Sequence, residues 1–115
     1  MKLQKLISKL EKHHKKKLDL SLGRTFNLLK KLGDPQDKLK NVITVVGTNA
    51  KASMCYSLKS ILNQAGYKTN LYTSPHLLSY TERYVFDDKE INEENLIELL
   101  TDIEKTLGDD NATLF

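Results

Sequence analysis

A chain of 115 residues, of which 39% are hydrophobic and 29% charged, has the composition of an ordinary globular domain. Its formal net charge is only +3, so the charge balance does not require a nucleic-acid partner. The single cysteine, Cys55, excludes an internal disulfide, and no stretch approaches the roughly 20 apolar residues of a membrane span. We therefore expect a soluble, cytoplasmic protein without a membrane partner, in which Cys55 is a small buried residue rather than a reactive thiol.

Two amphipathic helices are predicted at the start of the chain. Apolar residues recur at helical spacing in the first of them: Leu3, Leu6, Ile7 and Leu10. A shorter set marks the second: Leu22, Phe26 and Leu29. The first helix is expected to end near His13. The second should end at Gly33, because glycine is favoured just after a helix and Pro35 cannot continue one.

A basic run, Lys-His-His-Lys-Lys-Lys, occupies positions 12–17 between these helices. Such a run can attract nucleic acid or anionic lipid, but short basic stretches between helices are usually only solvated. A further hypothesis is that its positive charge draws anionic substrates toward a nearby site. We favour the interpretation that this basic run is solvated and does not bind nucleic acid.

A strand, a loop, a helix and a second strand are predicted in the middle of the chain. Residues 42–46, Val-Ile-Thr-Val-Val, are uncharged and stop at a glycine, as is typical of a buried parallel strand. Apolar residues at helical spacing follow, before Gly66: Met54, Leu58, Ile61, Leu62 and Ala65. Residues 68–73 then alternate polar and apolar. This order predicts a βαβ unit, and hence an α/β fold with a mostly parallel sheet flanked by helices.

The last third of the chain is expected to hold an extended segment and a helix. Residues 80–86 are predicted to be extended and to lead into a turn at Asp87 and Asp88. Apolar residues at helical spacing mark the helix, which should run from near Asn92 to Gly108: Leu96, Leu99, Leu100, Ile103 and Leu107. The final residues, 111–115, turn apolar, which favours a truncated sequence.

The turn between the predicted strand and helix has the residues of a phosphate-binding loop. Its members are Gly47, Thr48, Asn49, Ala50, Lys51, Ala52 and Ser53. A strand-to-helix turn offers backbone N–H donors and the positive end of the helix dipole to a polyphosphate. In this interpretation Lys51 reaches the β- and γ-phosphates of ATP, and the Ser53 hydroxyl lies near the phosphates or their Mg²⁺.

Two alanines depart from the general pattern of such loops. Ala50 and Ala52 stand where glycines are usual, next to Lys51. A methyl group is tolerated at such a position where φ is negative, but it costs stability or displaces phosphate where φ is positive. The alternative is an ordinary strand-to-helix turn whose Lys51 is merely solvated.

Four segments of the chain together resemble bifunctional dihydrofolate synthase/folylpolyglutamate synthase, a family of the Mur ligase superfamily. They are residues 45–53, 65–68, 71–77 and 80–83. The Thr-Ser-Pro-His-Leu element at 73–77 distinguishes this family, since Mur ligases share the loop type but not this sequel. The resemblance implies that the chain is the amino-terminal part of the P-loop ATP-binding domain of such a ligase.

The resemblance extends to the segment before the second helix. The positions that match are His14, Lys16, Asp19, Leu20, Leu22 and Arg24. The family's Asp-Leu-Gly-Leu portion contacts the pterin substrate, and it corresponds here to Asp19, Leu20, Ser21 and Leu22. Ser21 replaces the family's usual glycine, so a close approach of the backbone to the pterin is altered there.

The resemblance also implies the reaction and its cofactors. ATP and Mg²⁺ would be used to join L-glutamate to dihydropteroate or to a folate through an acyl phosphate, in folate and one-carbon metabolism. Lys51 would be the catalytic residue, and Ser74 matches the family serine that coordinates Mg²⁺; the glutamate and histidine ligands should lie beyond Phe115. The partners would be small molecules only, the full-length enzyme a monomer, and the 115-residue chain alone inactive.

Other interpretations remain open from the sequence. A Mur-type ligase of cell-wall synthesis would share the ATP chemistry, and a degenerate α/β module would use the loop only to hold an anion. His76 is either a ligand or base, or a residue that shapes its loop, and Glu82 and Arg83 could form a structural ion pair. Three parts are expected: helices over 1–40, the βαβ unit over 41–74, and a substrate and metal loop with a helix over 75–115.

Overall fold

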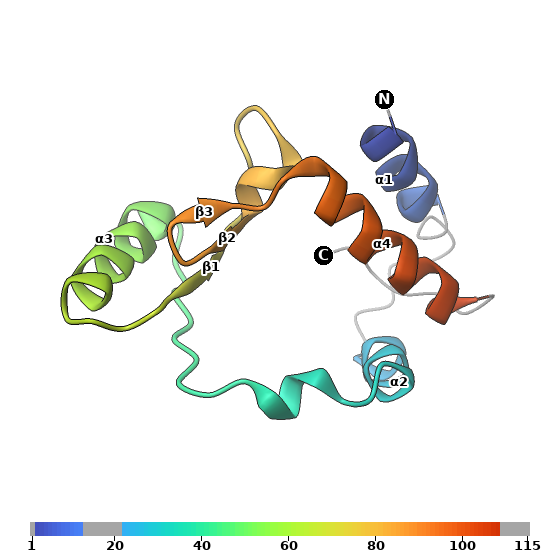
Figure 1. Cartoon of the computed structure of the whole chain (residues 1–115), viewed down its shortest axis with the longest axis horizontal. Coiled ribbons are helices and arrows are strands. Elements are labelled where there is room, and N and C mark those ends of the chain that lie inside the picture. The colour runs from blue at the N-terminus through green and yellow to red at the C-terminus, as the bar shows by residue number, and fades with distance from the viewer. Residues whose placement is uncertain (1, 13–21, 109–115) are drawn as a thin grey trace. The chain divides into compact units, whose positions relative to one another are not determined.

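The computed structural model describes residues 2–12 and 22–108. The chain divides into two compact units. One contains residues 1–41 and 94–115, and the other contains residues 42–93. Helices and a small sheet occur in the same chain (Figure 1), in agreement with the expected α/β class. Over the described ranges, no helix combines the length and the apolar character that crossing a membrane requires.

The first unit is built on two helices that lie side by side (Figure 1), α1 (Lys2–Lys12) and α4 (Glu93–Leu107). Their buried residues recur at helical spacing: Leu3, Ile7 and Leu10 on α1, and Leu96, Leu100 and Leu107 on α4. The Lys9 ammonium group donates to the Glu104 carboxylate across the pair. Both predicted helices are confirmed, and Gly108 follows α4 with a φ of +60°.

Helix α2 (Gly23–Lys31) is also confirmed, together with its predicted end at Gly33. Gly33 has a φ of +82°, a conformation that glycine adopts without a steric penalty. The Gly33 N–H donates to the Lys30 carbonyl at 3.1 Å, and the Asp34 N–H donates to the Leu29 carbonyl at 2.9 Å. These two bonds satisfy the last carbonyls of the helix, and the short 3₁₀ helix η1 (Pro35–Lys38) follows.

The second unit contains an antiparallel sheet in the order β1-β2-β3, formed by β1 (Asn70–Tyr72), β2 (Tyr84–Phe86) and β3 (Lys89–Glu90). Leu71 pairs with Val85 in the first ladder, and Val85 pairs with Glu90 in the second. The predicted turn at Asp87 and Asp88 connects β2 and β3. The strand expected within 68–73 therefore forms, but it is shorter and has an antiparallel neighbour.

The strand expected at 42–46 does not form, and the prediction of a parallel βαβ pairing within the described residues is wrong. This segment is assigned no strand, and its apolar side chains are exposed: Val42 by 67%, Ile43 by 62% and Val46 by 84%. A β-strand depends on neighbouring strands for its backbone hydrogen bonds, and β1 pairs with β2 instead. The β-branched pattern thus indicated that residues 42–46 suit a strand, but it did not indicate which strands would pair with them.

Helix α3 (Lys51–Gln64) begins within the phosphate-loop residues, at Lys51, and ends as predicted before Gly66, whose φ is +91°. No residue of α3 is buried. Polar contacts join it to the sheet instead: the Lys59 ammonium group donates to the Thr69 carbonyl at 3.2 Å, to the Thr69 hydroxyl at 3.0 Å and to the Asp87 carbonyl. Because an ammonium group has three donors, Lys59 is saturated by these contacts.

Candidate functional site

The predicted phosphate loop is a continuous turn that leads into α3. Gly47 has a φ of +155°, a conformation that favours glycine, and residues 47–49 bend toward the helix. Ala50 is the N-cap of α3, with φ +58° and ψ +18°, in the left-handed region. A residue with a β-carbon held in this region costs on the order of 1 kcal/mol or more. The structure therefore places strain at the first of the two unusual alanines.

The second alanine lies in a different environment. Ala52 is the second residue of α3 and is exposed. Alanine is the most favourable residue in a helix interior, so no strain is expected at this position. Of the two alanines that depart from the general loop pattern, only Ala50 is therefore expected to carry backbone strain.

The amino end of α3 leaves its first N–H groups without a side-chain cap. Ala50 has no oxygen that could accept from them, and this absence costs roughly 1 kcal/mol relative to a serine or aspartate. No acidic residue lies in the first turn, which begins with Lys51. By contrast, α4 begins with Glu93 and Glu94, which suit the positive end of a helix dipole. The start of α3 is therefore unfavourable for the helix alone and favourable for a bound anion.

Lys51 bends back over this loop. Its ammonium group donates to the Gly47 carbonyl at 2.7 Å, which joins the first and fifth residues of the turn. Thr48, Asn49 and Ser53 are exposed, and the Ser53 carbonyl accepts from the Ser57 hydroxyl at 2.8 Å. The lysine thus lies beside the uncapped helix end, where it can exchange the carbonyl for an anionic oxygen.

A second loop, residues 73–83, begins at the end of β1 and holds Ser74. Ser74 is exposed. Residues Tyr80–Arg83 form the 3₁₀ helix η2, so the extended structure predicted for 80–86 is correct only for Tyr84–Phe86. The sequence contained a signal for this helix, since Ser79 and Glu82 have the spacing of a capping box.

Glu82 closes the middle of this loop. Its carboxylate accepts from the backbone N–H groups of Leu77 at 3.0 Å, Leu78 at 2.8 Å and Ser79 at 2.6 Å. The N–H group of Leu77 contributes most to lowering the pKa of this carboxyl below its ordinary value of 4.5, followed by those of Ser79 and Leu78, and the neighbouring His76 adds a smaller effect. Glu82 therefore binds the backbone of its own loop.

Arg83 lies at the base of the same loop and is buried, with 6% of its surface exposed. Its Nε donates to His76 Nδ1 at 2.9 Å, and its guanidinium carbon lies 4.6 Å from the centre of the Tyr80 ring. The His76 and Tyr80 rings meet edge to face at 5.4 Å. His76 thus shapes its loop, as one of the two sequence hypotheses states.

Tyrosines extend this cluster onto the sheet. The Tyr84 ring lies 5.4 Å from that of Tyr72 and 6.1 Å from that of Tyr80. Burial raises the pKa of the Tyr84 hydroxyl above its usual range, and the neighbouring Tyr80 adds to the effect. Tyr84 therefore stays neutral and serves as packing beneath the loop.

The lowered pKa of Glu82 predicts a pH-dependent loop. A carboxyl whose pKa is lower in the folded state stabilises that state above the ordinary value of 4.5, and this contribution disappears as the pH falls through the folded value. Amide NMR shifts of Leu77, Leu78 and Ser79 should therefore titrate together with a midpoint below 4.5. Glu82→Gln should abolish this titration, while Glu98→Gln on α4 should not. A midpoint at or above 4.5 would contradict the assignment.

The predicted pterin segment is largely outside the described residues. Asp19, Leu20 and Ser21 lie there, as do residues 13–17 of the basic run. Leu22 is described: it is the N-cap of α2, and its side chain is 64% exposed. An exposed leucine next to a helix end is available for an apolar contact, but its role as a substrate contact stays a prediction.

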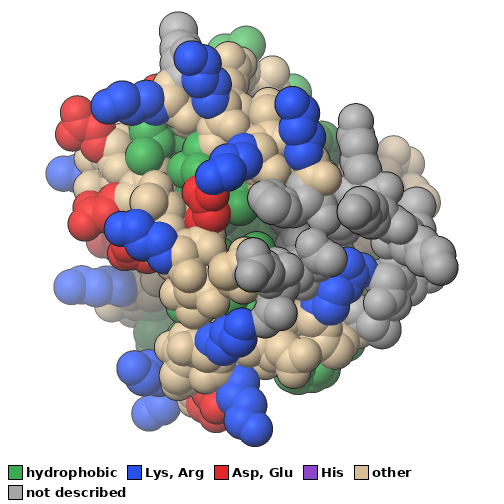
Figure 2. Space-filling view, turned by 90° about the vertical axis from the view of Figure 1, so that its right-hand side faces the viewer, with side chains coloured by type: hydrophobic (Ala, Val, Ile, Leu, Met, Phe, Trp, Pro, Cys, Tyr) green, Lys and Arg blue, Asp and Glu red, His purple; other side chains and the backbone are tan. Residues whose placement is uncertain are grey.

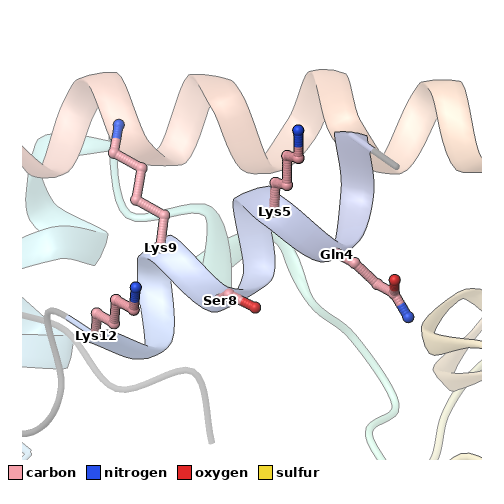
Figure 3. A pocket seen from close by; sticks show the side chains of 5 residues that line it. All are labelled: Gln4, Lys5, Ser8, Lys9 and Lys12. Atoms are coloured by element: carbon pink, nitrogen blue, oxygen red, sulfur yellow. The ribbon is translucent and has the colours of Figure 1, made fainter.

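A hollow of about 450 Å³ lies along α1 and contains none of the predicted site residues. Its lining residues are Gln4, Lys5, Ser8, Lys9 and Lys12 (Figure 3). Lys9 extends toward α4, where it contacts Glu104, so one of the three ammonium groups is already neutralised. On the face shown in Figure 2, lysine and arginine side chains are spread out, with acidic side chains between several of them. Among the described residues visible in these two views, the basic side chains do not gather into a concentrated basic patch.

The donor set for a metal ion is small in the described part of the chain. Within 2–12 and 22–108, no three or more His, Cys, Asp or Glu residues form a group that could hold a metal ion. Ser74 offers one exposed hydroxyl oxygen. Mg²⁺ accepts such hard oxygens and keeps several water or phosphate ligands, so Ser74 fits as one ligand of a nucleotide-bound ion rather than as a complete site. Cys55 is partly buried and carries a free thiol.

Relatives of the chain were found among known proteins. No protein-family model matches it. Over 109 residues, or 95% of its length, the chain is 40% identical to the dihydrofolate synthase/folylpolyglutamate synthase of Escherichia coli strain K12. Its structure is similar to that of E. coli FolC in complex with DHPP and ADP, with a TM-score of 0.82, 39% identity and 96% of this chain covered. It is also similar to the bifunctional enzyme of Yersinia pestis complexed with AMPPNP and Mn ion, with a TM-score of 0.83, 35% identity and 96% coverage.

The chain spans about a quarter of the length of these relatives. It covers 26% of the E. coli sequence and 27% of each of the two solved chains. The match to these structures confirms the α/β class. The predicted resemblance is likewise confirmed, because a relative of that name is 40% identical over 95% of the chain.

Proposed function

Since the chain belongs to the dihydrofolate synthase/folylpolyglutamate synthase family over the quarter of the family's length that it spans, we propose that it supplies the nucleotide-binding loop of an ATP-dependent ligase. The ligase would join L-glutamate to dihydropteroate or to a folate. The observation that carries the proposal is the start of α3, where an uncapped helix end lies beside the Lys51 ammonium group. A relative with ADP bound supports a nucleotide as the anion held there.

The proposed reaction needs electrostatic help more than a nucleophilic side chain. An oxygen of the acceptor carboxylate attacks the γ-phosphorus of ATP, and ADP leaves. The glutamate amino group then attacks the acyl carbon, phosphate leaves and the amine loses a proton. Lys51 would neutralise charge that develops on the transferred phosphoryl group, and the first N–H groups of α3 would hold the phosphates.

A divalent ion would neutralise further charge on the phosphates when it is bound. Ser74 would supply one oxygen ligand to it, and the Mn ion in the Yersinia pestis relative supports the use of a divalent ion. The pterin would lie against Asp19, Leu20, Ser21 and Leu22, as the resemblance implies. A monomeric, cytoplasmic enzyme without nucleic-acid or membrane partners stays a prediction, as does the division at residues 40 and 74.

A chimera tests the proposal directly. In the chimera, the 115-residue chain replaces the matched segment of the E. coli relative, to which the chain is 40% identical. ADP release should then require both dihydropteroate and glutamate. The relative with the segment deleted, and the 115-residue chain alone, should release none. ADP release that responds to a muramoyl acceptor would instead support a Mur-type ligase, and no turnover by a folded chimera would favour the degenerate anion-binding module.

A further inference from the structure

The pair Glu82-Arg83 stands out in the sequence, and the reaction proposed above gives it no role. Both residues contact the loop that contains Ser74. The tip of this loop is poorly packed, since Leu77 is 90% exposed and Leu78 is 94% exposed. Burial of apolar side chains therefore does not fix the conformation of the tip, and hydrogen bonds must do so.

Arg83 contacts the loop on both sides of Ser74. The Arg83 carbonyl accepts from the Thr73 N–H at 3.0 Å, immediately before Ser74. The Arg83 Nε donates to His76 Nδ1 at 2.9 Å, two residues after Ser74. One buried residue thus brackets the short segment that carries the hydroxyl group.

The side chain of Arg83 is itself held in place. Its guanidinium group lies 4.6 Å from the Tyr80 ring centre, and the ring of Tyr80 also contacts that of His76 at 5.4 Å. An imidazole that accepts at Nδ1 carries its proton at Nε2, so this contact fixes both the ring orientation and the tautomer of His76. The Glu82 carboxylate accepts from the backbone N–H groups of the three residues that follow His76, so two consecutive residues contact both halves of the loop.

We propose that Arg83 is a positioning residue, which acts through His76 to orient the Ser74 hydroxyl toward the metal ion of the bound nucleotide. This inference rests on the function proposed above, because it requires Ser74 to be a metal ligand. Neither Arg83 nor His76 touches the reacting atoms in this assignment. Residues that orient a metal ligand typically change metal affinity by about 10-fold or more when they are replaced.

The test uses Mn²⁺ as the probe, titrated into the full-length chimera with AMPPNP present. His76→Phe keeps a ring of similar shape against Tyr80 but removes the acceptor for Arg83 Nε. We expect it to weaken Mn²⁺ binding about 10-fold, with AMPPNP affinity in the absence of metal changed less than about twofold. His76→Asn, whose side-chain oxygen can accept in place of Nδ1, should restore most of the affinity. Arg83→Lys, which lacks Nε, should behave like His76→Phe.

Ser74→Ala separates this inference from the function on which it rests. If Ser74→Ala weakens Mn²⁺ binding and His76→Phe does not, Arg83 and His76 have no positioning role and the inference is overturned alone. If Ser74→Ala leaves Mn²⁺ binding unchanged, the metal assignment fails and the inference fails with it. The inference is supported if the double variant, Ser74→Ala with His76→Phe, binds Mn²⁺ no more weakly than Ser74→Ala alone. Without the Ser74 hydroxyl, His76 has no metal ligand left to orient. Additive losses in the double variant would overturn the inference.

Discussion

Lys51→Met is expected to lower kcat/KM for ADP formation by the chimera by about 100-fold or more. Methionine keeps an unbranched side chain but cannot donate a hydrogen bond or carry charge. Lys51 already lies over the loop, 2.7 Å from the Gly47 carbonyl, so little rearrangement is needed for its ammonium group to reach a phosphate oxygen. Removal of one such donor typically costs two to three orders of magnitude in rate.

Lys68→Met provides the matched control for this effect. Lys68 is an exposed lysine in the same unit, between α3 and β1, and its loss should change kcat/KM less than about twofold. Steady-state ADP release at saturating glutamate measures both variants. A Lys51→Met chimera within about fivefold of its parent would show that this lysine only closes the loop through its contact with Gly47.

Ala50→Gly is expected to strengthen ATP binding by roughly fivefold, and to raise the free energy of unfolding of the chain by about 1 kcal/mol. The physical reason is the φ of +58° at Ala50, which glycine adopts without a steric penalty. Relief of that strain stabilises the loop conformation that presents the first N–H groups of α3. Calorimetric titration of the chimera with ATP and Mg²⁺ measures the affinity, and urea denaturation of the chain measures the stability.

Ala52→Gly is the matched control, with the opposite sign. Ala52 lies inside α3, where glycine costs about 0.5–1 kcal/mol relative to alanine. The variant should therefore be less stable than the parent and should bind ATP no more tightly. Equal effects of the two substitutions would contradict the conformational difference between positions 50 and 52.

The helices could be predicted from the sequence because their signals are local. Apolar residues on one face identified α1, α2, α3 and α4 to within a few residues, and a glycine just beyond the last turn marked the ends of α2, α3 and α4. The glycines at 33, 66 and 108 all have positive φ, as their predicted positions after helices require. Secondary-structure signals of this kind need no knowledge of the tertiary partners.

The sheet could not be predicted in the same way, because strand pairing is not local. The run at 42–46 looked like the best strand in the sequence, yet Val42, Ile43 and Val46 are exposed. Pairing instead joins β1 to β2, where Asn70 lies opposite Phe86. Alternation of polar and apolar residues predicts which residues suit a strand, but it does not specify the neighbour or its direction.

The candidate site could be predicted only in part, because some of its features depend on local sequence signals and others on non-local contacts. The proposed phosphate loop is contiguous in sequence, so spacing alone could single out its members, and Lys51 lies beside the start of α3; the role of Lys51 toward ATP stays a prediction. The role of Glu82 had a readable signal in its capping-box spacing from Ser79, which was missed. The contact of Arg83 with His76, 7 residues away, and that of Lys59 with Asp87, 28 residues away, have no such signal, since they depend on how the intervening residues fold.

The identity of the product formed by the chimera tests the central claim most directly. Mass spectrometry of a reaction with ATP, glutamate and dihydropteroate should show dihydropteroate with one added glutamyl group, formed in proportion to the ADP released. This product should be absent when the Lys51→Met chimera is used. ADP released without any glutamyl product, by a folded chimera whose Lys51 is intact, would contradict the assignment of this chain to a glutamate ligase.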